Sequence, residues 1–400
     1  MIPILFDKNT APKTILAYNK LGLGVLNDCI SATVTEELNG SYELEIQYPI
    51  NGAHFDEIDY CSWIKAKPFV DGDIQLFRVY KISKPLDGVC TINAEHVSYL
   101  LDYVIVDTAP NFSHVESLNL PQAMYTVNSR IMESVYASGG NLHFDLAYEG
   151  QRTAQQFFMD KVRSVRDYLL GKERSFLTIY GGEFEFNNFS VCLYQSEPPG
   201  SRGSDRGVTI QYGKNLCSLR QEISDEGLVT RYYPYILVDI PPTTEADYGE
   251  FMKRDITWYA EASPYIDTFA PELMPYPYQR TIALNLKDFE KWKNVEPTEQ
   301  FALPITVQDF YDCVSQYVLA NMDTVFDLHY SLDVSFIDVA SAEEYKNIES
   351  LEKINMADYV TVKYPKFNIS KKLKVTKTEF NVLEERYNKV TLGSPRKTLV

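Results

Sequence analysis

The sequence holds little of what enzymes use to build a catalytic site. It has five histidines, none of them in an HExxH motif or at the spacing of zinc ligands. A GxxxxGK[ST] loop and a GxSxG turn are absent, and the glycines of LGLGVLND lack the third glycine of a dinucleotide-binding turn. We therefore predict that the protein is not an enzyme and has no catalytic residue, no cofactor and no metal site.

The remaining candidates for chemistry have ordinary explanations. Glu95 and His96 are neighbours on a predicted strand and point to opposite faces, so they cannot bind one ion together. We expect His96 to pack or to form hydrogen bonds. The acidic pairs at 36–37 and 384–385 stand at polar edges and are predicted to be solvated charge, unlike the facing carboxylates of a glycosidase.

The chain also lacks signs of export and of a membrane span. Its N-terminal apolar run, Ile2–Phe6, is too short for the core of a signal peptide or for a transmembrane helix. The six cysteines show no CxxC and no regular spacing, which in an unexported chain indicates reduced thiols. Nothing marks Cys61, Cys90 or Cys217 as a nucleophile. We expect assembly in a cytoplasm and no membrane insertion.

The charge is negative and unevenly distributed. The formal net charge is −17, but residues 361–400 hold ten Lys or Arg and three Glu, a net of +7, so the first 360 residues carry −24. An acidic body repels the phosphates of nucleic acid, so specific DNA binding is not expected, whereas DNA can slide past such a surface. The lysines of the alternating run LKVTKTEF, residues 373–380, are predicted to lie on a solvated strand face.

Strand and turn patterns dominate the first hundred residues. An Asn-Gly pair at 39–40 predicts a type I′ hairpin. The run SYELEIQYP follows it, with its apolar residues on one face and Glu43, Glu45 and Gln47 on the other. A short helix is predicted over AEHVSYLLDY, and a small barrel or sandwich is the expected fold. Further strands are predicted over 62–67, 75–83 and 89–94.

Residues 101–204 change to an α+β pattern, and the strand pattern then resumes in two separated blocks. Helices are predicted from Pro121 to Gly139-Gly140 and over 154–170, followed by a hairpin of 175–180 with 183–186 and a strand over 190–194. After the linker PPGSRGSDRG, strands are predicted over 208–239. A block of different character follows, with a helix over 307–322 and a strand over SLDVSFIDV, before closing strands over 360–364, 373–380 and 386–392.

Few single residues can be given a role. Gly40, Gly207 and Gly213 are predicted turn glycines that need a permissive backbone. The Asp205-Arg206 pair either braces the start of the second strand block or is an exposed linker pair.

Seven landmarks in order resemble one family. They are NGSYELEIQYP, QLFRVYKISK, AEHVSYLL, DRGVTIQYGKNL, TRYYPYI, LEKINMADYVTVKYPKFNISKKLKV and RYNKVTLG. Together they are similar to the tail-hub protein of Gram-positive siphophages. That family is also known as the prophage endopeptidase tail, the tail-associated lysin N-terminal region or the phage minor structural protein. The similarity runs from about residue 30 to the end.

The resemblance implies a fold similar to the contractile-phage baseplate hub. It is a β-dominated α+β multidomain fold with two tail-tube-like β-barrel domains and two α+β accessory domains, the last inserted into the second barrel. On this chain the implied domains are 1–100 (first barrel), 101–204 (α+β), 205–240 with 356–400 (second barrel) and 241–355 (inserted α+β).

The resemblance further implies a virion protein of the distal tail tip. It would form a homotrimer whose six barrels make a pseudo-sixfold ring that caps the tail tube and opens for passage of the tape measure protein and DNA. Its implied partners are other copies of itself, the distal tail protein, the tail tube and the tape measure protein, with DNA only passing through. Cell-wall-cleaving members carry that activity in modules that follow this region. The chain stops at SPRKTLV, so we expect a short hub protein, with a shortened parental chain as the alternative.

Two rival functions remain open. One is a peptidoglycan hydrolase of which this would be the N-terminal region. The other is a receptor-binding or carbohydrate-binding tail protein, which the 29 tyrosines suggest. A β-rich protein uses aromatic residues on half-buried strand faces in any case, so the composition does not decide between them.

Overall fold

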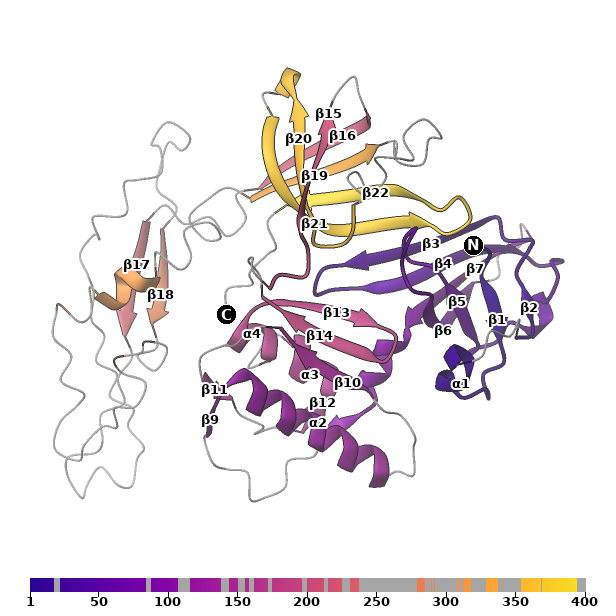
Figure 1. Cartoon of the computed structure of the whole chain (residues 1–400), viewed down its shortest axis with the longest axis horizontal. Helices are drawn as coiled ribbons and strands as arrows, with labels where there is room; N and C mark the ends of the chain where they lie inside the picture. The colour runs from indigo at the N-terminus through magenta and orange to yellow at the C-terminus, as the bar shows by residue number, and fades with distance from the viewer. Residues whose placement is uncertain are drawn as a thin grey trace. The chain divides into compact units, whose positions relative to one another are not determined.

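The chain divides into two compact units in the computed structural model, residues 1–221 with 331–400, and residues 222–330. Figure 1 shows the whole chain. The structure describes residues 1–17, 22–83, 88–106, 116–137, 144–149, 155–157, 162–171, 175–195, 200–211, 215–224, 231–236, 279–284, 289, 291, 308, 312–317, 329–336, 354–367 and 369–393.

One sheet of thirteen strands dominates the first unit. Its order is β16-β19-β22-β21-β3-β4-β7-β6-β5-β1-β2, with β20 paired to β21 and β15 paired to β20. Strands from both ends of the sequence therefore lie in the same sheet (Figure 1). The bounds are β1 Ile4–Phe6, β2 Gly24–Val25, β3 Ser31–Glu37, β4 Tyr42–Pro49, β5 Trp63–Ala66, β6 Gln75–Ser83, β7 Val89–His96, β15 Asp205–Gln211, β16 Leu216–Ser224, β19 His329–Phe336, β20 Tyr359–Tyr364, β21 Ile369–Asn381 and β22 Arg386–Gly393.

The β3–β4 hairpin shows why this region folds as a sheet. The apolar residues of β4 are buried, while Glu45 and Gln47 on its other face are exposed, as the alternation predicts. The type I′ turn was a wrong prediction, because that turn has a positive φ at both of its central residues. The Glu37 N–H bonds to the Ser41 carbonyl, and only Asn39 has a positive φ (57°). Gly40, predicted to need such a backbone, does not adopt it.

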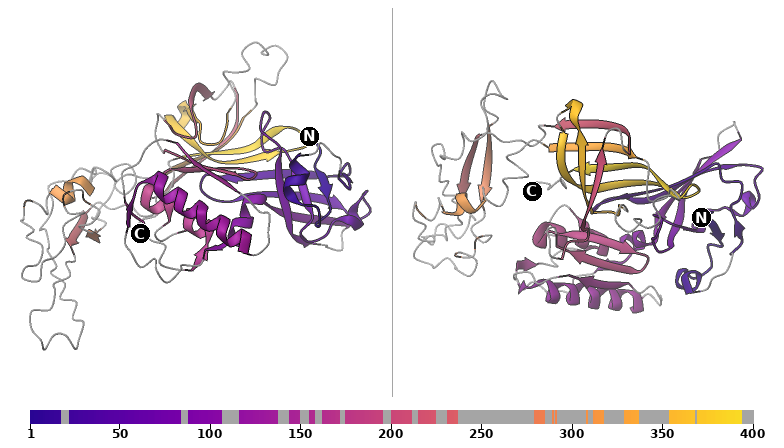
Figure 2. Two further views of the ribbon diagram at one scale, coloured as in Figure 1. Left: turned by 60° about the horizontal axis from the view of Figure 1, so that its bottom comes forward. Right: turned by 45° about the horizontal axis from the view of Figure 1, so that its top comes forward.

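A smaller sheet and its helices follow the N-terminal strands. The order β10-β14-β13 is formed by β10 (Asp145–Tyr148), β14 (Ser190–Tyr194) and β13 (Glu183–Asn187). The predicted helix at Pro121 is confirmed as α2 (Leu120–Ala137), which runs along this sheet (Figure 2).

Two predictions in this region were wrong. Among its described residues, the helix expected over 154–170 is helical only in α3 (Val165–Leu170), because the Ser164 hydroxyl accepts from the Asp167 N–H and begins the helix there. The strand expected over 175–180 is α4 (Phe176–Tyr180), begun by a capping box of Ser175 and Thr178. Short two-stranded pairs fill the rest: β9 (Glu116–Leu118) with β11 (Gln155–Phe157), and β8 (Ile105–Val106) with β12 (Arg163–Ser164).

The second unit is described over a few segments. Strands β17 (Arg231–Ile236) and β18 (Gln279–Leu284) pair in parallel. Residues 312–317 are helical and bury Cys313 and Val314, within the helix predicted over 307–322. Apart from Gln308, the rest of that prediction lies outside the described residues.

The fold is α+β and dominated by strands, as predicted. Strand pairing closes no barrel among the described residues, so the two barrels and the limits of the four domains remain predictions. Strands β15 and β20, from the two separated blocks, nevertheless pair in parallel. The other helical elements that the structure describes in the first unit are short: α1 Pro12–Ala17, η1 Phe55–Glu57, η2 Val97–Asp102 and η8 Pro365–Phe367.

Candidate functional site

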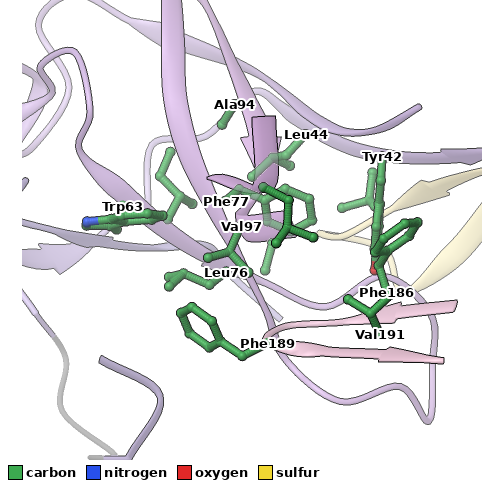
Figure 3. Packing of buried hydrophobic residues seen from close by; sticks show 14 of the residues in the cluster. Tyr42, Leu44, Trp63, Leu76, Phe77, Ala94, Val97, Phe186, Phe189 and Val191 are labelled. Atoms are coloured by element: carbon green, nitrogen blue, oxygen red, sulfur yellow. The ribbon is translucent and has the colours of Figure 1, made fainter. Parts of the chain in front are cut away.

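The first unit contains two separate hydrophobic cores, which we call the N-terminal core and the C-terminal core. The N-terminal core combines the first β-strands with the small sheet, and Figure 3 shows Phe189 beside Leu76, and Phe186 and Val191 near Tyr42. The C-terminal core consists of Val208, Ile210, Leu332, Val334, Ile354, Met356, Ala357, Val360, Val362, Ile369, Val375, Val390 and Leu392.

Strand β21 passes from one core to the other. Its first half, Ile369–Lys374, pairs with β20, and its second half, Lys377–Asn381, pairs with β3. Along the strand, Val375 is buried in the C-terminal core and Phe380 in the N-terminal core. The register against β22 shifts between Val375 and Lys377 and again between Glu379 and Phe380. β-Bulges of this kind bend a strand and increase its twist.

A buried ion pair lies where β21 leaves the C-terminal core. The Lys374 ammonium donates to Glu183 Oε1 of β13, and these side chains are only 4% and 2% exposed. The other oxygen, Glu183 Oε2, is buried without a hydrogen-bond partner. Burial raises the pKa of the Glu183 carboxyl despite the hydrogen bond from Lys374. The Lys374 ammonium also lies 5.0 Å from the centre of the Tyr359 ring.

A second buried cation, Arg202, follows the small sheet in sequence. Its guanidinium lies 2.6 Å from Glu36 Oε1 of β3 and 3.7 Å from Glu185 Oε1 of β13, and it donates to the Phe184 carbonyl at 3.2 Å. Burial acts to lower the pKa of Arg202, but the carboxylates of Glu36 and Glu185 outweigh it and raise that pKa. Arg202 therefore ties β3 to β13 through charged and backbone groups together.

The turn of the first hairpin adds a third link to β13. The Asn39 amide donates to the Gly182 carbonyl at 3.0 Å and accepts from the Phe184 N–H at 2.8 Å. A side-chain amide thus replaces a strand partner at the start of β13. We call these links, Lys374–Glu183, Arg202–Glu36/Glu185 and Asn39–Gly182/Phe184, the polar joint.

The chain that leads from Arg202 into β15 is held by Asp358. The Asp358 carboxylate accepts from the Ser204 N–H at 2.8 Å and from the Asn355 N–H at 2.8 Å, and Arg206 lies 3.7 Å away. A Cβ at Gly203 would stand 1.8 Å from the Ala357 carbonyl oxygen, so only glycine fits there.

His96 lies in the N-terminal core rather than in a reactive site. Its ring is fully buried, stacks on Tyr42 at 4.3 Å, and hydrogen-bonds to Ser98 Oγ at 2.9 Å and Gln75 Oε1 at 3.1 Å. Burial, and then the charge of Arg166, lower its pKa to about 3. The neutral ring therefore serves as a hydrogen-bonding core residue, as its position beside Glu95 predicted.

The structure corrects two predictions about charge. Glu36, predicted to be solvated, is 6% exposed and pairs with Arg202. Lys374, predicted to face water within LKVTKTEF, is the buried partner of Glu183. Both were missed because their partners, Arg202 and Glu183, are more than 160 residues away in sequence. Strand alternation alone does not reveal such partners.

The other residues considered from sequence are placed as follows. Gly207 has φ 74°, as a turn glycine requires, whereas Gly213 lies outside the described residues. Asp205 pairs with Lys372 of β21, and Arg206 pairs with Asp358, so each links the start of β15 to another part of the sheet.

Neither a metal site nor a membrane helix is found in the described part of the chain. There, no three His, Cys, Asp or Glu side chains are grouped to hold an ion. No helix in the same part is both long and apolar enough to span a bilayer.

Comparison with known proteins points to one class of protein. A family model described as the prophage endopeptidase tail matches residues 204–400. No curated protein matches the sequence. Three solved structures share the fold across nearly the whole chain.

The first is prophage tail protein gp18 from Listeria monocytogenes EGD-e, with 16% identity, a TM-score of 0.54 and coverage of 100% of this chain and 96% of that chain. The second is the 43 kDa tail protein of prophage MuSo2 from Shewanella oneidensis, with 11% identity, a TM-score of 0.57 and coverage of 99% and 98%. The third is a tail protein from Neisseria meningitidis MC58, with 6% identity, a TM-score of 0.56 and coverage of 98% and 96%. At these identities the likeness establishes the fold.

Proposed function

We propose that this chain, which belongs to the prophage tail proteins, is a structural subunit of the tail hub and forms a homotrimeric ring at the distal end of the tail tube. One observation carries the proposal. The pairing of β3 with β21 places two strand regions of one chain, each with its own core, side by side in a single sheet.

Symmetry gives this arrangement its use. Two strand regions in each of three copies would supply six positions around a threefold axis, which matches a sixfold tube on one side and threefold partners on the other. The proposed neighbours are the distal tail protein, the tube and the tape measure protein. The acidic sequence suits a channel along which DNA passes without adhering.

The polar joint supports a mechanical function. It links β3, β13 and β21, and the four charged side chains of its two buried ion pairs are at most 9% exposed, so the two strand regions of one subunit are held in a defined arrangement. A subunit that bears load in a tail needs such cross-links between regions that are distant in sequence.

A peptidoglycan endopeptidase is the second candidate, favoured by the description of the matching family. The two functions are separated by a zymogram on cell walls of Gram-positive and Gram-negative bacteria. The hub proposal expects no clearing band from the purified chain, with lysozyme as the positive control. Clearing that follows the purified chain would establish an enzyme.

The hub proposal itself is tested by electron microscopy of the purified chain. Class averages are expected to show threefold particles with an outline close to sixfold. Particles that are single copies at micromolar concentration, or rings of another symmetry, would contradict it.

A further inference from the structure

We propose that β21 is a hinge between the two cores, and that the buried pair of Lys374 and Glu183 is the latch that holds the hinge in the arrangement seen here. The hinge segment is 375–380, and the two bodies that it joins are the N-terminal and C-terminal cores. Only the purpose of the hinge rests on the function proposed above: it would let a hub subunit change between two arrangements.

The first support is that apolar side chains of one strand, β21, are buried in two different cores. Ile369 and Val375 are buried in the C-terminal core, and Phe380 is buried in the N-terminal core. Within the part of the chain that the structure describes, Tyr387 is the one side chain that packs against both cores. Its ring meets Phe380 at 5.4 Å and its hydroxyl donates to the Ile354 carbonyl at 3.0 Å.

The second support is the backbone between the two bodies. Both register shifts between β21 and β22 fall where β21 runs over 375–380. The first makes Thr376 of β21 the extra residue, and its carbonyl accepts from the Leu38 N–H of the hairpin turn, whereas the second makes Asn388 of β22 the extra residue. The β21–β22 hairpin therefore has a bulge on each strand where the bodies meet. Bulged strands bend at a smaller backbone cost than regular ones, so this is where rotation is expected.

The third support is the chemistry of the contact. Two closely packed apolar surfaces lose buried area when they part, whereas separated charges regain water. The latch pair is buried, and Glu183 Oε2 has no partner while the pair is closed. Opening would hydrate that oxygen together with the rest of the pair, which offsets part of the attraction that is lost.

The fourth support is a further covalent crossing, besides β21 and the return through β22 from Val382 in the N-terminal core to Val390 in the C-terminal core. The chain passes from the small sheet to β15 through residues 200–204, which contain Gly200 (φ 99°) and Gly203. Arg202 in this segment pairs with β3 and β13, and Ser204 bonds to Asp358 beside the C-terminal core. The segment is therefore fixed to one body at Arg202 and to the other at Ser204, and it joins the two bodies as β21 and β22 do.

Hydrogen–deuterium exchange of the full chain, followed by mass spectrometry, tests the hinge. In the unmodified protein the amides of β3 and of Lys377–Asn381 are expected to exchange at least about tenfold faster than those of the β4–β7 pair within the N-terminal core. In Lys374→Met they are expected to exchange about tenfold faster again, while β4–β7 is unchanged. The matched control is Val79→Ala, which opens a cavity in the N-terminal core and is expected to speed exchange in β4–β7 instead.

If Lys374→Met does not fold, the double variant Lys374→Met with Glu183→Leu is measured instead, because it replaces the pair by apolar groups. In this variant the amides of β3 and Lys377–Asn381 are expected to exchange more slowly than in the unmodified protein. The hinge would be overturned if, in the unmodified chain, the amides of β3 and Lys377–Asn381 exchanged as slowly as those of β4–β7. It would also be overturned if Lys374→Met folded and the exchange of the β3 and Lys377–Asn381 amides did not change. If the chain is a trimer and the amides of β21 are uniformly protected, the hub proposal stands and the hinge proposal fails. If the chain is a monomer and the amides of β3 and Lys377–Asn381 exchange rapidly, the hinge proposal stands and the hub proposal fails.

Discussion

Lys374 of β21 and Glu183 of β13 form an ion pair that joins the C-terminal strands to the small sheet across 191 residues of sequence. Both side chains are almost fully removed from water. Moving two charges out of water is costly, and their mutual attraction only repays that cost when both remain in place. Such a pair serves a defined arrangement of two parts more than it serves stability.

The first prediction concerns this pair. Lys374→Met leaves the Glu183 carboxylate buried without its partner, and is expected to destabilise the first unit by about 3–5 kcal/mol. The double variant Lys374→Met with Glu183→Leu is expected to return close to the stability of the unmodified protein, or above it. The measurement is the midpoint of urea unfolding of the three proteins. A loss below about 1 kcal/mol in the single variant would show that the pair is not buried in solution.

The second prediction compares two arginines that are four residues apart. Arg202→Lys loses the planar fork that reaches Glu36, Glu185 and a carbonyl together, and is expected to cost about 2–3 kcal/mol. Arg206→Lys is the matched control because its side chain is 36% exposed, and surface pairs contribute little. The control is expected to lie within about 0.5 kcal/mol of the unmodified protein. Equal losses from both variants would contradict the role given to Arg202.

The third prediction compares two glycines on either side of β15's first residues. Gly207→Ala meets open space and suffers only from its positive φ, so a loss of about 1–2 kcal/mol is expected. Gly203→Ala places a methyl group 1.8 Å from the Ala357 carbonyl oxygen and must displace the 200–204 segment. We expect a larger loss, and a crystal structure in which Ser204 no longer meets Asp358. The reverse order of losses would mean that residues 203 and 357 are not in contact.

The fourth prediction concerns pH. The folded-state pKa of His96, about 3, lies below its ordinary 6.5, so the unfolded chain binds the extra proton between these values. The contribution of His96 is therefore complete above about pH 6.5 and is lost as the pH falls towards 3. The slope amounts to at most about 1.4 kcal/mol per pH unit.

This slope is measured by the urea midpoints of the unmodified protein and of His96→Gln between pH 7 and 4. Carboxylates titrate in both proteins alike, so the difference between the two curves isolates His96. The unmodified protein is expected to lose stability more steeply on acidification. Parallel curves would show that His96 accepts a proton while folded.

Much of the β-structure could be predicted from sequence, because it depends on neighbouring residues. The alternation in β4 and the spacing of β20 to β22 are local patterns, and the structure bears them out. The errors at 154–170 and 175–180 arose where a single N-cap residue determines whether and where a helix begins. A hydroxyl at Ser164 or Ser175 starts a short helix within a stretch whose apolar pattern fits more than one structure.

The polar joint could not be predicted. Glu36 shares the face of β3 that buries Ala32 and Val34, whereas Lys374 shares the face of β21 that exposes Lys372. The partners that allow these two charges to be buried, Arg202 and Glu183, come from elsewhere in the sequence. Local periodicity carries no information about partner residues that are distant in sequence.

Light scattering of the purified chain after gel filtration determines whether the subunit forms the proposed threefold hub. A trimer is expected to appear as a species of about three times the subunit mass of 45.9 kDa, present at micromolar concentration and maintained on dilution. A species at the subunit mass, unchanged over a hundredfold range of concentration, would contradict it.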